Sequence, residues 1–207
     1  MEQKAGLLAG LSKLAIEAEP NVVEQLLAYL SELQQWNRAY NLTAVRDPLE
    51  MVPRHLLDSL SILPWLRGER LLDVGTGAGL PGIPLAIVEP GRRWALLDSN
   101  GKKTRFLRHV VRTLGLENVS VLEGRSEACQ PGQLPDCITA RALAALPDLV
   151  AMVAHLCPPG GRILAMKGRL DEAELAAVPE PFQLLARERL TVPGLTSERN
   201  LIVIEHK

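Results

Sequence analysis

The stretch LLDVGTGAGLPG, residues 71–82, joins a short and mostly apolar run to a loop in which four of eight residues are glycine. Glycine has no Cβ atom, so a backbone rich in it can turn sharply and lie directly against a ligand. An apolar run that ends in such a turn is typical of a buried strand followed by a ligand-binding loop. The stretch therefore predicts an α/β fold and raises the question of its ligand.

Downstream of the glycine loop, short apolar runs alternate with longer amphipathic stretches. This alternation predicts a parallel sheet with helices on both faces. The tail differs, because two β-rich runs at 182–192 and 199–207 follow each other with no helical pattern between them. We therefore expect a terminal antiparallel pair at one edge of the sheet. The expected parallel strands are 70–75, 94–99, 119–124, 136–142 and 162–168.

Upstream of the glycine loop, the pattern is helical. Apolar residues at helical spacing predict two helices within residues 5–35, and 49–66 reads as a further helical stretch broken by Pro53 and Pro64. We expect a single domain, 1–207, in which residues 1–64 form a helical cap and residues 65–207 form the ligand-binding core.

Composition limits the classes of protein that fit. A hydrophobic content of 47%, a charged content of 23% and a net charge of −1 describe a globular chain of 207 residues. No apolar run approaches the roughly 18 residues of a membrane span, and the first residues are charged, so we expect a cytoplasmic location. The three cysteines show no paired spacing, which argues against a disulfide framework and a zinc site; we expect no bound metal.

The glycine loop itself allows two ligands. Gly77, Gly79 and Gly82 fit the G-x-G-x-x-G pattern of dinucleotide sites, and Asp98 follows at about the spacing of a ribose-binding acid. However, Pro81 removes an N–H donor that a pyrophosphate would use, and the carboxylate of Asp73 would repel phosphates. A ligand with ribose hydroxyls, a cationic centre and no phosphate fits better, and S-adenosylmethionine is such a ligand. We expect Asp73 to lie where its sulfonium or amino charge is tolerated.

Polar groups follow all five expected parallel strands. Because ligands of open parallel sheets bind at the carboxyl ends of the strands, these groups are expected to share one rim. They are Asp73 with Gly75, Asp98, the segment 124–127, Arg141, and Lys167 with Gly168.

Seven motifs in this order carry a family resemblance: WNRAYNLT, RHLLDSL, GAGLPGIPLAI, LLDSNGKKTRFL, GRSE, ARA and MKG. The glycine loop resembles the first motif of class I S-adenosylmethionine-dependent methyltransferases. The whole set, over about residues 22–205, resembles the bacterial small-subunit (16S) ribosomal RNA guanine-N7 methyltransferases, also called glucose-inhibited division protein B. The resemblance implies a Rossmann-like, seven-stranded, mostly parallel sheet with an antiparallel edge strand and an N-terminal helical extension.

The resemblance also implies the ligands. It implies S-adenosylmethionine as cofactor and a guanine of small-subunit rRNA, free or in the 30S particle, as substrate. The family often has Ser before the arginine at 141, whereas this chain has Ala140. Together with the loop pattern, the resemblance predicts cofactor contacts at Gly75, Gly77, Leu80, Asp98, Ser126, Glu127 and Arg141.

Guanine N7 has a lone pair and no proton, so methylation there needs alignment and no general base. The chain has neither the Asp/Asn-Pro-Pro-aromatic run that resembles exocyclic-amine methyltransferases nor a Pro-Cys nucleophile; LPDCITARAL occupies that place. We therefore expect no catalytic acid–base residue. Arg141 is expected to hold either the guanine O6 edge or the methionine carboxylate of the cofactor.

Contacts with RNA are predicted at Lys102, Arg105, Lys167 and Arg199. Lys102 and Arg105 lie on the basic face of an amphipathic helix, which either follows an RNA backbone or is simply solvated. Lys167 either contacts a phosphate or pairs with Asp73.

Two further motifs near the N-terminus have open interpretations. His55 and Asp58 lie one helical turn apart, and we expect the histidine to donate to that carboxylate as an anchor of the cap. Trp36 and Tyr40 either stack on a base or, as we favour, pack the cap onto the core.

Two other functions remain open at this point. A nicotinamide-dependent oxidoreductase (NAD as cofactor) would also use a glycine loop, and a non-catalytic module would bind RNA or cofactor without methyl transfer. We expect a monomer with no membrane partner and no obligate protein partner.

Overall fold

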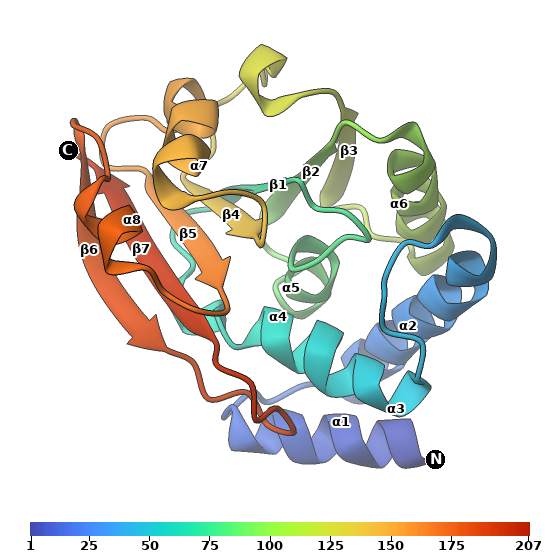
Figure 1. Ribbon diagram of the computed structural model, residues 1–207. Helices are drawn as coiled ribbons and strands as arrows, with labels where there is room; N and C mark the ends of the chain where they lie inside the picture. Colours follow the sequence, from blue (N-terminus) through green and yellow to red (C-terminus); the bar gives the residue numbers. More distant parts are fainter.

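A seven-stranded sheet organises the molecule, which the computed structural model describes from residue 1 to residue 207 (Figure 1). The strand order is β3-β2-β1-β4-β5-β7-β6. Strands β1 to β5 are parallel, and β7 is antiparallel to both of its neighbours, as expected for the tail. The strands are β1 (Arg70–Val74), β2 (Arg93–Asp98), β3 (Val119–Glu123), β4 (Cys137–Arg141), β5 (Arg162–Lys167), β6 (Phe182–Arg189) and β7 (Asn200–His206).

The helices lie on both faces of this sheet. They are α1 (Glu2–Lys13), α2 (Pro20–Tyr40), α3 (Pro48–Met51), α4 (Asp58–Leu60), α5 (Gly82–Val88), α6 (Gly101–Leu114), α7 (Leu146–Val153) and α8 (Glu172–Ala176). None of them combines the length and the apolar character needed to cross a membrane.

Alternating strand residues divide the core into two layers. Leu71 belongs to the apolar cluster that includes side chains of α1, α2, α5 and α6, whereas its neighbour Leu72 belongs to the cluster beneath α7. This follows from strand geometry, in which successive side chains point to opposite faces. The N-terminal helices therefore share one core with the sheet and with α5 and α6.

The expected helix break at Pro53 is wrong. The helical path continues from α3 through a π-helical segment, Val52–Leu57, into α4. Proline has no N–H and its ring clashes with the carbonyl four residues earlier, and a locally widened turn is one way in which a helix accommodates such a residue. This widened segment carries His55, and Asp58, the first residue of α4, follows it directly.

The strand order fixes where a ligand can bind. The chain passes from β1 outward to β2 and β3 and then returns to the other side of β1 to form β4. Crossover helices then leave β1 and β4 toward opposite faces, which opens a crevice at the carboxyl ends of these two strands.

Candidate functional site

The glycine loop after β1 forms the floor of this crevice. Gly75 has a φ of +63°, in the left-handed region that disfavours residues with a side chain. A Cβ atom at Gly75 would also lie 2.5 Å from Cδ1 of Leu143, whereas a Cβ at Gly77 would meet no atom closer than 3.9 Å. Gly75 therefore leaves room for Leu143, and Gly77 presents open backbone to the crevice.

Asp73 holds this loop from below. Its fully buried carboxylate accepts hydrogen bonds from Thr76 Oγ1 (2.5 Å), Thr139 Oγ1 (2.9 Å) and the Gly82 N–H (3.0 Å). Burial raises the pKa of Asp73 to about 6, against the lowering effect of these donors. Asp73 is fully buried and lines neither pocket over the glycine loop, so the expectation that it lies beside a cationic ligand centre is wrong.

The same contacts bear on the dinucleotide alternative. The N–H of Gly82, the first residue of α5, is already bonded to Asp73, and Pro81 before it has no N–H. A pyrophosphate needs such free donors at a helix N-terminus. The loop is therefore poorly suited to a dinucleotide.

Asp98, the last residue of β2, is a second acid that contacts the glycine loop, and unlike Asp73 it lines the crevice. It accepts from the Gly77 N–H (2.9 Å) and the Asn100 N–H (2.9 Å), and Lys103 Nζ lies 3.6 Å away. These contacts use one lone pair on each oxygen, because a carboxylate has about four acceptor sites. Asp98 therefore keeps capacity for two hydroxyl donors.

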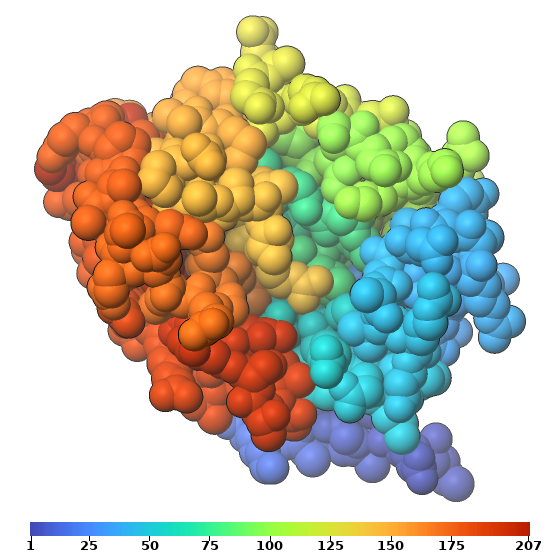
Figure 2. Space-filling view, in the orientation of Figure 1, coloured from blue at the N-terminus to red at the C-terminus, as the bar shows by residue number.

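Two adjoining pockets make up the crevice. Figure 2 shows the recessed surface on this face, between the gold segment after β4 and the blue N-terminal segment. The smaller pocket, of about 250 Å³, lies over the ends of β1, β2 and β3 and includes Asp98, Ser126 and Glu127. The larger pocket, of about 540 Å³, extends from the loop to the N-terminal helices and is bordered by Leu42, Leu80 and Met166 among its apolar side chains. The two pockets share Gly75, Lys103 and Leu143.

All seven predicted cofactor residues line this crevice. Asp98, Ser126 and Glu127 belong to the smaller pocket, Gly77, Leu80 and Arg141 to the larger one, and Gly75 to both. Their contact with a cofactor stays a prediction.

Three of the four predicted RNA contacts lie at the larger pocket or on α6. Arg199 lines the larger pocket, and Lys102 is exposed in the first turn of α6. Arg105 lies in a separate groove of about 400 Å³ beside α6, together with Trp36, Arg108 and Arg112.

Lys167 does not pair with Asp73, so that alternative is wrong. Its ammonium group donates to Glu174 Oε2 (2.7 Å) and to the Ala144 carbonyl (2.8 Å), because α8 and the loop after β4 both pass beside the end of β5. Its side chain is only 15% exposed. Contact with RNA stays a prediction that would require this pair to open.

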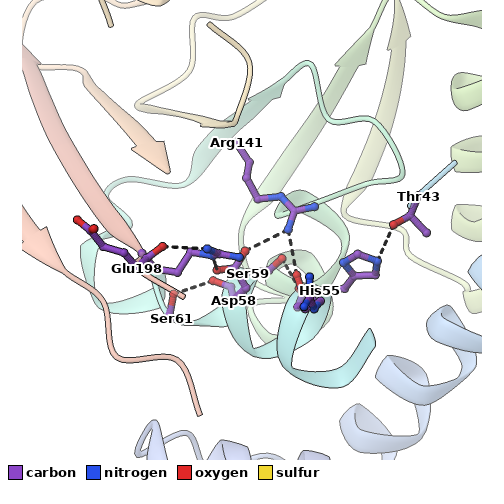
Figure 3. A network of polar contacts seen from close by, with 9 residues as sticks. Thr43, His55, Asp58, Ser59, Ser61, Arg141 and Glu198 are labelled. Atoms are coloured by element: carbon purple, nitrogen blue, oxygen red, sulfur yellow. Dashed lines mark hydrogen bonds and ion pairs between the residues drawn. The ribbon is translucent and has the colours of Figure 1, made fainter. Parts of the chain in front are cut away.

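Asp58 lies between two arginines at the wall of the larger pocket (Figure 3). Its Oδ2 accepts from Arg141 Nη1 (3.1 Å) and its Oδ1 from Arg199 Nε (3.0 Å). Arg141 also donates to the Arg54 carbonyl in the π-helical segment (3.2 Å). The expected hydrogen bond between His55 and Asp58 is wrong, because Nε2 of His55 contacts Thr43 Oγ1 and its Nδ1 has no hydrogen-bond partner.

His55 instead anchors the segment after α2. Its Nε2 lies 2.9 Å from Thr43 Oγ1, and the Thr43 N–H donates to Asn37 Oδ1 at 2.9 Å. Burial, reinforced by the positive charge of Arg141, lowers the pKa of His55 to about 4. The neutral imidazole thus fixes Thr43 at the edge of the larger pocket.

Trp36 packs the cap onto the core, as favoured. Its ring centroid lies 5.6 Å from that of Phe106 and 5.0 Å from that of His109, both on α6, and 5.3 Å from that of Tyr40. His109 Nε2 in turn contacts Glu32 Oε2 at 2.7 Å. These contacts join α2 to α6.

The fold and the crevice together define a class I methyltransferase architecture. The chain is similar in structure to TrmN from Thermus thermophilus, with a TM-score of 0.58, 22% identity, and coverage of 83% of this chain and 53% of TrmN. It is also similar to the N-methyltransferase NodS from Bradyrhizobium japonicum, with a TM-score of 0.55, 16% identity, and coverage of 74% and 94% of the two chains. At these identities the likeness establishes the fold.

Sequence comparison is more specific. A family model described as rRNA small subunit methyltransferase G matches residues 22–203. Two relatives with the name Ribosomal RNA small subunit methyltransferase G are 53% identical (Marinobacter nauticus, 94% of this chain and 91% of the relative) and 51% identical (Alkalilimnicola ehrlichii, 95% and 89%). The chain belongs to the rRNA small subunit methyltransferase G family.

Several residues of the crevice were not expected from the sequence. Lys103 borders both pockets, and Thr43 and Leu143 line the larger one. Lys103 follows the predicted Lys102 directly. Successive residues of a helix point in different directions, so the orientation of α6 decides that Lys103, and not Lys102, reaches the pockets. Thr43 carries no such signal, because only the folding of the cap brings it to the rim.

Proposed function

We propose that this protein transfers a methyl group from S-adenosylmethionine to N7 of a guanine in small-subunit ribosomal RNA. The observation that carries the proposal is the two-pocket crevice of this member of the methyltransferase family. The smaller pocket offers carboxylate oxygens that can accept hydrogen bonds from ribose hydroxyls, and the larger pocket offers no free general base.

The smaller pocket suits the adenosyl portion of the cofactor. The remaining lone pairs of Asp98 would accept from the ribose hydroxyls, while Ser126 and Glu127 would border the adenine. The open backbone at Gly75 and Gly77 lets a ligand pass from this pocket into the larger one. When bound, the cofactor would supply an activated methyl group on a sulfonium.

The larger pocket suits a reaction driven by alignment. Asp58 is its one carboxylate, and it is held in ion pairs with Arg141 and Arg199. His55 does not line this pocket, and burial lowers its pKa to about 4, which makes it a weak base. A guanine N7 needs no proton removed, so this lining is sufficient, and alignment can supply about 7–11 kcal/mol of the barrier in well-oriented systems.

We further propose that the chain acts as a monomeric single domain in the cytoplasm, where assembling small subunits are found. The cap 1–64 and the core 65–207 share one apolar cluster, which favours one folding unit.

Incubation with radiolabelled S-adenosylmethionine tests the proposal, with 30S particles, naked 16S rRNA and tRNA as separate acceptors. We expect label on one or both small-subunit substrates and strand scission at the labelled guanine after borohydride and aniline treatment, which reports N7 methylation. Label on tRNA or on protein alone would refute the substrate. Cofactor binding without transfer to any of the three would favour the non-catalytic module.

A further inference from the structure

The contacts of Asp58 use only part of the two guanidinium groups beside it. Arg141 donates from Nη1, and Arg199 from Nε to Asp58 and from Nη1 to the Glu198 carbonyl (2.8 Å). Nε and Nη2 of Arg141 and Nη2 of Arg199 have no hydrogen-bond partner in the protein. Both arginine side chains are 25% exposed and line the larger pocket. The cluster thus presents free donors to a ligand.

The charges of the cluster are also unbalanced. Asp58, with its side chain only 3% exposed, brings one negative charge against two positive charges. A charge that is held away from water is stabilised by a partner of opposite charge, and Asp58 can neutralise only one of the two arginines. The surplus positive charge beside apolar Leu80 and Met166 is the complement of an anion.

Arg199 reaches this place through the antiparallel strand. It directly precedes β7, and the register pairs Asn200 with Lys167, so the start of β7 lies beside the carboxyl end of β5 (Figure 1). Arg141 ends β4, which pairs directly with β1, whereas β4 and β5 separate β7 from β1. Arg199 therefore lies farther than Arg141 from β1 and the glycine loop that follows it.

We propose that Arg199, held in place by Asp58, binds a phosphate group of the substrate RNA at the larger pocket. Asp58 is then a positioning residue for the substrate, and the inference rests on the proposed function. Guanidinium groups match phosphate oxygens in geometry and charge. Arg141, next to the glycine loop, is left to the cofactor side of the same cluster.

The chemistry favours the phosphate over the base edge as the partner of Arg199. Methylation at N7 turns the guanine into a cation, so a net positive cluster at its edge would oppose the reaction. A phosphate is anionic before and after the transfer and experiences no such penalty.

Asp58 contributes by restricting Arg199. A free arginine side chain loses rotamer entropy when it is fixed on a ligand. The hydrogen bond from Nε to Asp58 fixes the plane of the guanidinium in advance and leaves Nη2 for the phosphate.

The steady-state test uses the variants Arg199→Gln, Arg199→Lys and Asp58→Asn. The control is Arg187→Gln, which removes the same charge from the edge strand β6, where Arg187 forms an exposed ion pair with Glu172 of α8. We expect Arg199→Gln to raise the KM for RNA about tenfold, to change kcat and cofactor affinity less than twofold, and to reduce the salt slope of RNA binding by about one. Arg199→Lys recovers part of this loss, and Arg187→Gln behaves as wild type. Equal losses of cofactor and RNA affinity in Arg199→Gln would show that the anion is the cofactor's carboxylate and overturn the proposal. An unchanged KM for RNA would assign the cluster to structure alone.

A binding test separates this proposal from the methyl-transfer proposal. Guanosine 5′-monophosphate and guanosine are each titrated into the protein, and their dissociation constants are measured from NMR chemical shifts. This measurement does not depend on methyl transfer. We expect the nucleotide to bind at least about tenfold tighter than the nucleoside in wild type, and this ratio to approach one in Arg199→Gln. In Asp58→Asn the ratio should also fall, and combining both substitutions should lower it no further. A wild-type ratio near one would overturn the phosphate site even if methyl transfer is confirmed, whereas a high ratio without methyl transfer would refute the proposed reaction and leave the anion site.

Discussion

The two pockets of the crevice are built in different ways. The smaller pocket is formed by turns that directly follow three neighbouring strands, and backbone N–H groups fix its acid, Asp98. The larger pocket also uses the glycine loop, but its other side is assembled from the segment after α2, the start of α4, β4, β5 and the residue before β7. Side-chain contacts among distant residues fix that side. The first is local in sequence and shared by a fold class, whereas the second depends on the docking of the cap and the tail.

The strongest test of this difference is a substitution at the point where the pockets meet. Gly75→Asp places a Cβ atom 2.5 Å from Cδ1 of Leu143 and adds a negative charge to the pocket that already contains Asp98. We expect cofactor affinity to fall by about a hundredfold, or about 3 kcal/mol, measured by calorimetry.

Gly115→Asp is its matched control. Gly115 has nearly the same φ, +64°, and no atom within 4 Å of an added Cβ, so it carries the backbone strain without the steric conflict. Its cofactor affinity should stay within about twofold of wild type, since strain at a single left-handed residue costs about 1 kcal/mol of stability. Equal losses in both variants would contradict a direct role of Gly75.

The sequence allowed the strand-end residues of the smaller pocket to be predicted, but not Lys103, Leu143 or Met152, which reach it from α6, the loop after β4 and α7. Strand ends can be located from apolar periodicity, and parallel strands bring them to one rim, so Asp98 and the segment 124–127 could be placed without coordinates. Asp73 was misjudged because its burial depends on Thr139, which arrives from β4. Asp58 was misassigned because spacing along a helix favoured His55, while its real partners lie 83 and 141 residues away.

The second test compares the buried acid beneath the loop with the buried imidazole of the cap. Burial raises the pKa of Asp73 from 3.8 to about 6, so its contribution to stability is complete below pH 4 and is lost as the pH rises through 6. Asp73→Asn has no such titrating group, so only the wild type should lose this stability as the pH rises. In urea titrations, the free energy of unfolding of the variant minus that of the wild type should therefore increase by about 1 kcal/mol from pH 5 to pH 7.

The contribution of His55 to stability has the opposite pH dependence. Burial lowers its pKa from 6.5 to about 4, so its contribution is complete above pH 6.5 and is lost as the pH falls through 4. His55→Gln should therefore lose stability relative to wild type by about 2 kcal/mol more at pH 7 than at pH 5. Parallel pH dependences in Asp73→Asn and His55→Gln would show that one of these groups is not buried as described.

A third test asks whether RNA is held beyond the larger pocket. Lys102 and Arg105 are exposed on α6, and neither forms an ion pair. We expect the double substitution Lys102→Gln with Arg105→Gln to raise the KM for RNA about fivefold and to lower the salt slope of binding by about two. The control, Arg187→Gln with Arg189→Gln, removes the same charge from β6 and should leave both quantities unchanged. Equal effects of the two pairs would indicate a general charge effect and no defined RNA path on α6.

The smallest expected effect is the most informative about the larger pocket. Because N7 of guanine carries no proton and the carboxylate of Asp58 is held by two arginines, no group of this pocket has to gain or lose a proton for the transfer. His55, with its pKa near 4, stays neutral over the assay range. We expect kcat to vary by less than about twofold between pH 6.5 and 8.5 at saturating substrate, because general base catalysis would instead give a slope set by the pKa of the base. A tenfold rise per pH unit below pH 7.5 would reveal a base in the pocket and would exclude N7 as the atom that is methylated.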